Sequence, residues 1–259
     1  MSTAIATTAT PLTSRNPIRP QRLSTLLRVE LRKLVDTRSG KAILGIGVAI
    51  PLAALVWMLF KGSEVAVSWR SYSQFRPILG LTIPLIGLFA MTAEWTQRTA
   101  LTTFTLSPRR GRVLAMKFAA AFALSMAVLA VAVAMTVGAV ALGGLITGEQ
   151  ASYDFLGTDL RGLVIMTALQ VTMAAGFGAL AAQTAVAVGA FLVAPTVWTV
   201  AGPLLFGTNA QWFDVFSAYD QLSSDAPLTN LPQTLTAIAV WVVLPTTIGV
   251  ARSLRREVK

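Results

Sequence analysis

One internal stretch, residues 94–117, carries six charged side chains. A single carboxylate, Glu94, opens the stretch. The other charged residues in it are all basic, namely Arg98, Arg109, Arg110, Arg112 and Lys117. Residues 96–106 can form a short helix, which Ser107 and Pro108 would end or bend. A basic loop on the inner side of a membrane accounts for the charges. It does not explain why residues 94–117 form so long a loop or why the loop would contain a short helix.

Catalytic and metal-binding chemistry lacks the residues that it needs. The sequence has no cysteine and no histidine, which excludes disulfides, thiolate or imidazole metal sites, Cys nucleophiles and His bases. No phosphate-binding loop is present either, because Gly40-Lys41 is followed by Ala42 and has no glycine at the required upstream position. We therefore expect no enzyme activity, no metal and no nucleotide bound by this chain.

Long apolar runs must position the charged stretch. Of the 259 residues, 54% are apolar and 12% are charged, with a mean hydropathy of +0.67, whereas soluble domains have about 25% charged residues. A helix needs about 20 apolar residues to cross the hydrocarbon core of a bilayer. Six runs qualify, with no charged residue in the central part of any of them: 42–60, 77–93, 118–146, 162–182, 185–206 and 233–251. The run 77–93 is short and contains Pro77 and Pro84.

The distribution of charge predicts the orientation of these spans. With the N-terminus inside, the inner segments 1–41, 94–117, 183–184 and 252–259 contain 17 of the 21 basic residues. Seven of the 11 acidic residues fall in the outer loops. Because basic residues collect on the cytoplasmic side, both termini are expected in the cytoplasm. The net charge of +10 then reflects topology, and nucleic-acid binding is not expected.

The N-terminal region divides into a tail and a helix. Residues 1–20 are rich in Ser, Thr, Ala and Pro and predict a disordered cytoplasmic tail. Residues 40–252 are expected to form the membrane domain, and 253–259 a cytoplasmic tail. In 21–39, leucines at helical spacing form one face and most charged residues the other. The apolar face contains Leu23, Leu26, Leu27, Leu31, Leu34 and Val35; the polar face contains Arg22, Arg28, Glu30, Arg32 and Lys33. This pattern favours an interfacial membrane helix over a solvated helix packed on a soluble domain.

Other features inside and between the spans are less distinctive. Small residues recur every fourth position and would allow close helix packing: Ala130, Ala134 and Gly138; Ala168, Thr172 and Gly176; Ala185 and Gly189. Three residues in the spans are predicted to approach a substrate path: Gln170, Trp198 and Thr199. The outer segment 207–232 contains four aromatic residues that either anchor a helix at the membrane surface or gate an exit: Trp212, Phe213, Phe216 and Tyr219.

Taken together, these features resemble the type-2 ABC exporter permeases, the membrane subunits of transporters whose ATPase is often a separate chain. The shared features are the basic amphipathic helix before the first span, Glu94 at the end of the second span, and the long outer aromatic segment. After Glu94 come Arg98-Thr99 and a leucine-containing helix, then Pro108 with arginines and Lys117. The resemblance covers residues 20–256.

The resemblance implies a concrete architecture and function. The fold would be all-α and integral to the membrane: six transmembrane helices preceded by an amphipathic interfacial helix, the elbow. Segment 94–110 is similar to the coupling helix that docks on the ATPase. The residues implied to contact the ATPase are Glu94, Arg98, Thr99, Leu101, Phe104, Leu106 and Arg109. A partner ATPase would bind ATP and Mg²⁺, and a second permease, identical or paralogous, would complete an alternating-access path for export of a lipophilic or amphipathic compound across the bacterial plasma membrane.

Three other functions are considered. An ion-coupled secondary carrier usually has a carboxylate or histidine within a span, and no span has one in its central part. A membrane enzyme would need a general base, and neither histidine nor paired intramembrane aspartates are present. A non-transporting assembly or sensor subunit with the same fold stays open.

Overall fold

The computed structural model describes residues 22–61, 67–72, 76–97, 109–224 and 229–255. Every regular element in these ranges is a helix, and one isolated bridge joins Ser68 to Ser152. The helices in order are α1 (Leu23–Asp36), α2 (Arg38–Lys61), α4 (Trp69–Tyr72), α5 (Arg76–Thr82), α6 (Leu85–Thr96), α8 (Arg110–Thr147), α9 (Leu156–Ala181), α10 (Thr184–Phe206), the 3-10 helix η2 (Gly207–Phe213), α11 (Val215–Ser223), α12 (Leu231–Ile238), the π-helical η3 (Ala239–Val243) and α13 (Leu244–Arg255).

Six of these helical stretches are long and apolar enough to cross a membrane. They correspond to the six predicted runs, so an all-helical protein with six candidate spans is confirmed in the described residues. The bounds differ most for the third, which begins at Arg110 rather than at residue 118. The second is divided into α5 and α6 at Pro84, because proline has no N–H and its ring clashes with the carbonyl four residues earlier. The sixth contains the π-helical turn η3.

A sharp corner joins α1 to α2. The hydroxyl of Thr37 donates to the carbonyl of Leu34 (3.3 Å) and accepts from the backbone N–H of Gly40 (3.1 Å), which links the end of one helix to the start of the next. A Cβ at Gly40 would lie 1.5 Å from the Leu34 carbonyl oxygen. The corner therefore requires glycine at residue 40, and it directs α1 back along the bundle.

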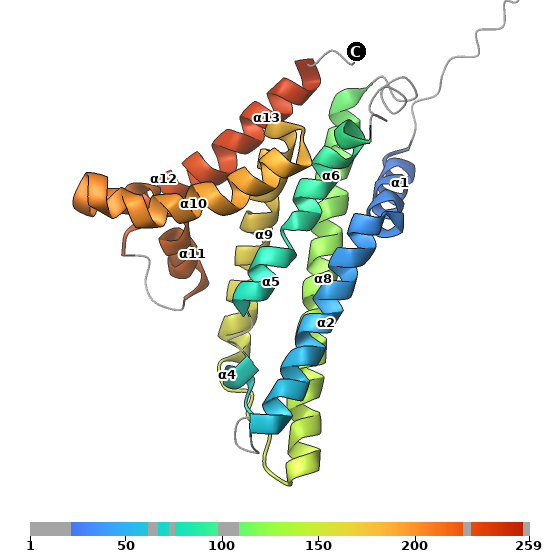
Figure 1. The fold of residues 1–259 in the computed structure, drawn as a ribbon, viewed down its shortest axis with the longest axis vertical. Coiled ribbons are helices and arrows are strands. Elements are labelled where there is room, and N and C mark those ends of the chain that lie inside the picture. The colour runs from blue at the N-terminus through green and yellow to red at the C-terminus, as the bar shows by residue number, and fades with distance from the viewer. Residues whose placement is uncertain (1–21, 62–66, 73–75, 98–108, 225–228, 256–259) are drawn as a thin grey trace, which may run out of the picture.

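The bundle is built around α9. Figure 1 shows α2, α8 and α9 running along the long axis of the molecule, with α1 beside one end of α8 and the end of α13 near the same end. Helices α6 and α13 approach α9 at glycines. A Cβ at Gly178 would lie 2.8 Å from the Leu88 carbonyl oxygen, and one at Gly176 would lie 2.5 Å from the Thr246 hydroxyl. These contacts confirm close packing at the small residues of α9.

The other two small-residue patterns do not pack in this way. A Cβ added at Gly138 of α8 or at Gly189 of α10 would meet no atom of the described residues within 4 Å. The prediction of close helix contacts at these two positions is therefore wrong within this chain. Figure 1 shows that α10 and α12 run across the long axis instead of along it, which leaves much of α10 without a helical neighbour.

Candidate functional site

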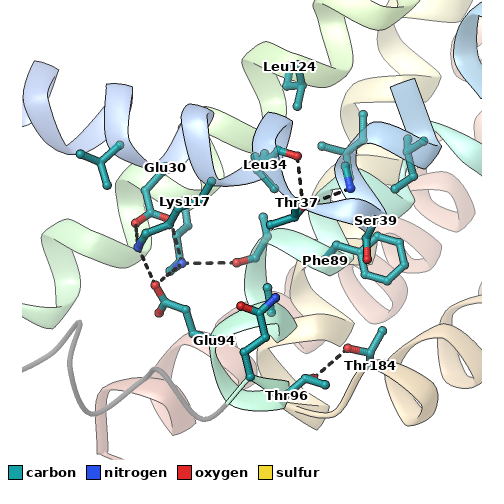
Figure 2. A pocket seen from close by; sticks show the side chains of 18 of the residues that line it. Glu30, Leu34, Thr37, Ser39, Phe89, Glu94, Thr96, Lys117, Leu124 and Thr184 are labelled. Carbon is teal, nitrogen blue, oxygen red and sulfur yellow. Dashed lines mark hydrogen bonds and ion pairs between the residues drawn. The ribbon is translucent and has the colours of Figure 1, made fainter. Parts of the chain in front are cut away.

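Four charged side chains meet where α1, α6 and α8 pack together (Figure 2). Lys117 Nζ lies 2.8 Å from Glu30 Oε2 and 3.0 Å from Glu94 Oε1. Lys33 Nζ lies 2.8 Å from Glu30 Oε1 and 2.8 Å from Glu94 Oε1. Each lysine therefore contacts both carboxylates, and we refer to Glu30, Lys33, Glu94 and Lys117 as the ion cluster.

Helix α1 brings its two members to the cluster through its buried face. Leu26, Glu30 and Leu34 are spaced by four residues and are all buried, because residues four apart share one face of a helix. Glu30 lies between two leucines that pack into the bundle, and Lys33 lies one turn further along. The pattern of charged residues in 21–39 predicts Glu30 on the polar face of this helix, and that prediction is wrong.

Helices α6 and α8 supply the partners from their ends. Glu94 follows the buried Met91 and Thr92 in the last turn of α6, and Lys117 lies among the buried Val113, Leu114 and Ala120 near the start of α8. Lys117 Nζ also lies 3.5 Å from the carbonyl oxygen of Ala90. The two helix ends are thus joined to α1 and to each other by the same ammonium group.

Burial makes the cluster energetically sensitive. Glu30 and Lys117 are each 5% exposed and Glu94 is 7% exposed, whereas the Lys33 side chain is 41% exposed. Two carboxylates and two ammonium groups give a net charge of zero. Burial alone lowers the pKa of Lys33, but its hydrogen bonds to Glu30 and Glu94 and their negative charges outweigh this effect, so the pKa is raised. Lys33 is accordingly held as a cation.

A cavity of about 790 Å³ adjoins the cluster. Its polar side is formed by the ion cluster, and most of its remaining wall is apolar. The apolar wall includes Leu26, Leu34, Ile43, Leu44, Ile86, Phe89, Ala93 and Leu124. Thr96 and Thr184 close another side, where their hydroxyls lie 2.9 Å apart and connect α6 to the start of α10. The site thus has the amphipathic character and the size of a small-molecule pocket.

The residues predicted to contact an ATPase fall into two groups. Glu94 is buried in the ion cluster, and Arg109 is exposed at the position just before α8. The remaining five lie outside the described residues: Arg98, Thr99, Leu101, Phe104 and Leu106. Glu94 and Lys117 therefore flank the predicted coupling segment from its two sides.

The three predicted path residues are not brought together by their contacts. Gln170 of α9 is 7% exposed and lies beside α5, where a Cβ at Gly80 would come 3.5 Å from its Oε1. Trp198 of α10 donates from Nε1 to the carbonyl of Ala210 (3.2 Å) and stacks on Phe206. Thr199 donates to a carbonyl of its own helix, that of Pro195, at 3.1 Å. A path through all three stays a prediction.

The predicted gate residues differ in exposure. Trp212 and Phe213 in η2 are each 38% exposed and Phe216 in α11 is 39% exposed, whereas Tyr219 is 2% exposed. The Tyr219 hydroxyl lies 3.4 Å from Met173 Sδ in α9, and burial raises the pKa of this phenol. Tyr219 thus anchors α11 on the bundle, while the other three aromatic side chains form a partly exposed surface.

A second polar contact holds the far end of the bundle. Asp159, in the first turn of α9, accepts a hydrogen bond from Trp69 Nε1 (2.8 Å) and pairs with Arg76 at the start of α5. Arg161 donates to the carbonyl of Ser224, just after α11 (2.8 Å). These contacts join short elements to α9 and involve none of the residues of the ion cluster.

The sequence analysis found Glu94 but missed its partners as a set. A usable signal was present in α1, since Glu30 falls between Leu26 and Leu34 on the spacing of the buried face. Lys117 gave a weaker signal, because a lysine at the start of an apolar run is also expected in a cytoplasmic loop.

In the described part of the chain, no group of three or more His, Cys, Asp or Glu residues could hold a metal ion. Searches with protein-family models and among curated proteins gave no match to this chain.

Proposed function

We propose that this chain is the membrane subunit of an ATP-driven transporter, which exports a lipophilic or amphipathic compound together with a separate ATPase and a second permease chain. The observation that carries the proposal is the ion cluster. It ties both flanks of the segment between α6 and α8 to α1, through Glu94 on one side and Lys117 on the other.

The mechanical consequence is direct. A displacement of the segment between α6 and α8 would move the end of α6 and the start of α8 together, because one ammonium group contacts carboxylates from α6 and α1. Helix α1 would follow, and the hydroxyl contact of Thr96 with Thr184 would carry the movement to α10. In this proposal Glu94 positions the coupling segment, and Arg109 is free to meet the ATPase at the surface.

The orientation follows the charge distribution. The proposal puts the ion cluster, α1 and both termini on the cytoplasmic side of a bacterial plasma membrane, with α1 at the membrane surface as an elbow helix. The support is the content of basic residues in 1–41, 94–117 and 252–259. The partly exposed Trp212, Phe213 and Phe216 would then lie toward the outer surface, as a gate or an anchor.

The ion cluster also bears on the ion-coupled carrier, since Glu94 and Glu30 are buried carboxylates near a candidate span. Such carriers use intramembrane carboxylates to bind the coupling ion. Here both carboxylates are neutralised by lysines at 2.8–3.0 Å. The coupling-ion position is thus filled by the protein's own cations, which favours the ATP-driven function.

The test is a pull-down of the tagged chain in mild detergent, followed by an ATPase assay of the eluate. We expect an ATPase chain to co-purify with the wild type and to be lost with Arg98→Glu plus Leu101→Asp. The matched control is Arg22→Glu plus Leu23→Asp, which makes the same changes at two exposed residues, the one before α1 and the first of α1, and should retain the ATPase. A wild-type chain that purifies without any ATPase would overturn the proposal.

A further inference from the structure

The cavity beside the ion cluster has two chemically distinct parts. One part carries two ammonium groups and two carboxylates within hydrogen-bond distance of one another. The other is a wall of aliphatic and aromatic side chains from three different helices, including Leu44 of α2, Phe89 of α6 and Leu124 of α8. A molecule that fills the cavity must therefore have a charged end and a hydrocarbon end.

The net charge of the cluster restricts the charged end. Because two positive and two negative charges sum to zero, an anionic group near Lys33 gains attraction from the lysines and loses a similar amount to repulsion from Glu30 and Glu94. A purely cationic group gains attraction from Glu30 and Glu94 and loses a similar amount to repulsion from the two lysines. A zwitterion gains on both sides, since its anion can accept from Lys33 and its cation can donate to a carboxylate.

The exposure of the four residues indicates how such a group would bind. Lys33 is the half-exposed member of the cluster, whereas Glu30, Glu94 and Lys117 are at most 7% exposed. A phosphate could therefore accept a hydrogen bond from the Lys33 ammonium, which has three N–H donors and can rotate. The contact would not disturb the buried members of the cluster. A carboxylate oxygen accepts more than one hydrogen bond, so an ammonium with N–H groups could add to those that the lysines already make. A quaternary ammonium has no N–H and could not.

We propose that this cavity binds a phospholipid with a primary-amine, zwitterionic headgroup, of the phosphatidylethanolamine type, with its headgroup at the ion cluster and its acyl chains against Leu44, Phe89 and Leu124. The lipid fills the space beneath α1 and stabilises the packing of α1 on α6 and α8. This inference does not rest on the proposed function, because lipid binding needs neither an ATPase nor a transported compound.

The test measures lipid retention and thermal stability of the purified full-length chain in a neutral detergent. Phosphatidylethanolamine, phosphatidylcholine and phosphatidylglycerol with identical acyl chains are added separately at equal mole fraction. Bound lipid is counted by native mass spectrometry, and the unfolding midpoint is followed by fluorescence. We expect phosphatidylethanolamine to be retained about tenfold more than either other lipid, the effect of one hydrogen bond to a charged group, and to raise the midpoint most.

Two tryptophan variants on the same helix localise the effect. Leu124→Trp fills the cavity and should abolish the preference for phosphatidylethanolamine. Leu145→Trp adds the same side chain at a residue that is 84% exposed and does not line the cavity, and it should behave as the wild type. If Leu124→Trp does not fold, Ala93→Phe fills the cavity from α6 and makes the same test.

A third variant tests the headgroup. Lys33→Gln removes the ammonium assigned to the phosphate, a group that phosphatidylethanolamine and phosphatidylcholine share, and should reduce retention of both lipids below that of the wild type. Equal retention of all three lipids by the wild type would overturn the proposal. So would a cavity-filled variant, shown by circular dichroism to be folded, that retains phosphatidylethanolamine as the wild type does. If the chain co-purifies with an ATPase but shows no lipid preference, the lipid site is wrong and the transport proposal is unaffected. If it prefers phosphatidylethanolamine but no ATPase co-purifies, the transport proposal is wrong and the lipid site is unaffected.

Discussion

The candidate spans Leu156–Ala181, which is α9, and Thr184–Phe213, which contains α10, follow one another in the chain and have the same mean hydropathy of 1.8, yet they pack very differently. In the most apolar part of α9, 56% of the residues are buried, against 22% in that of α10. Gly176 and Gly178 of α9 contact the backbones of α13 and α6, whereas a Cβ at Gly189 of α10 would meet nothing within 4 Å in the described residues. Many apolar side chains of α10 are exposed, among them Val193, Val197, Val200, Leu204, Leu205 and Phe206.

Hydropathy therefore identifies a helix that can enter a membrane, but it does not predict which other helices that helix contacts. A glycine becomes a packing site only where a neighbouring backbone approaches it. We call α1, α2, α6, α8, α9 and α13 the packed region, and α10, η2, α11 and α12 the open region. Substitutions in the packed region should destabilise the protein strongly, and equivalent substitutions in the open region should have little effect.

The largest effect is expected from the ion cluster in the packed region. Lys117→Met leaves Glu30 and Glu94 with Lys33 as their remaining cluster partner, so buried negative charge is no longer balanced. Breaking a buried ion pair typically costs about 3–5 kcal/mol. The measurement is the free energy of unfolding in mixed micelles with increasing denaturing detergent.

The control for this variant is Arg32→Met, which removes an exposed basic residue of α1. Arg32 pairs with Asp36 at 3.1 Å, but both side chains are more than half exposed, and such pairs contribute less than about 1 kcal/mol. Equal losses for Lys117→Met and Arg32→Met would mean that the cluster adds nothing beyond a surface ion pair.

The next effect compares two glycines directly. Gly176→Val should cost about 1–3 kcal/mol or more, because its Cβ would lie 2.5 Å from the Thr246 hydroxyl and 2.8 Å from the Thr246 nitrogen. Gly189→Val should leave stability within about 0.5 kcal/mol of the wild type. Thermal unfolding in detergent, with both variants side by side, measures the difference. A costly Gly189→Val would show that α10 has a close neighbour in the assembled protein.

A smaller effect is expected within the open region, at the start of α11. Asp214 accepts hydrogen bonds from the backbone N–H groups of Phe216 (3.1 Å) and Ser217 (3.4 Å) and so caps the helix. Asp214→Ala should cost about 1 kcal/mol. Asp220→Ala removes a carboxylate from the same helix without removing a cap, and the thermal midpoint of this control should stay near that of the wild type.

The smallest effect concerns pH. The folded pKa of Lys33 is raised above its ordinary value of 10.5, so its contribution to stability is complete below that pH and is lost as the pH rises through the folded value. The wild type should therefore lose more stability than Lys33→Met when the unfolding midpoint is compared at about pH 8 and about pH 11. Parallel losses in the two proteins would show that Lys33 does not contribute to the alkaline transition.

The sequence predicted the helices better than their contacts. The run of apolar residues located α10 closely, but it placed the start of α9 six residues late, at residue 162 rather than at Leu156. It placed the start of the third span eight residues late, since Arg112 and Lys117 belong to α8 but look like loop residues. Lys117 can stay in the helix because Glu30, 87 residues away in sequence, accepts its hydrogen bond. No local pattern specifies a pairing over that distance.

The orientation of α10 lay beyond the sequence for a related reason. Its apolar composition is compatible with any environment that excludes water, and its direction is set by Ala182, where the chain takes a left-handed turn with a φ of 53°. Alanine adopts that conformation rarely, so the residue type does not predict the turn. Half of the candidate site could therefore be predicted from the sequence. Glu94 was identified by its position at the end of a predicted helix, but its pairing with Glu30, Lys33 and Lys117 is visible only once the helices are assembled.

The ion cluster also has a consequence for how the protein is made. Translation produces α1 first, but Lys117 follows Glu30 by 87 residues and Glu94 follows Lys33 by 61. Until α8 has left the ribosome, Lys33 alone is available to neutralise Glu30, and burying a partly compensated carboxylate is unfavourable. Helix α1 is therefore synthesised before α6 and α8 but is seated only after them, and a nascent chain interrupted after α6 would display α1 undocked to the quality-control proteases of the cell.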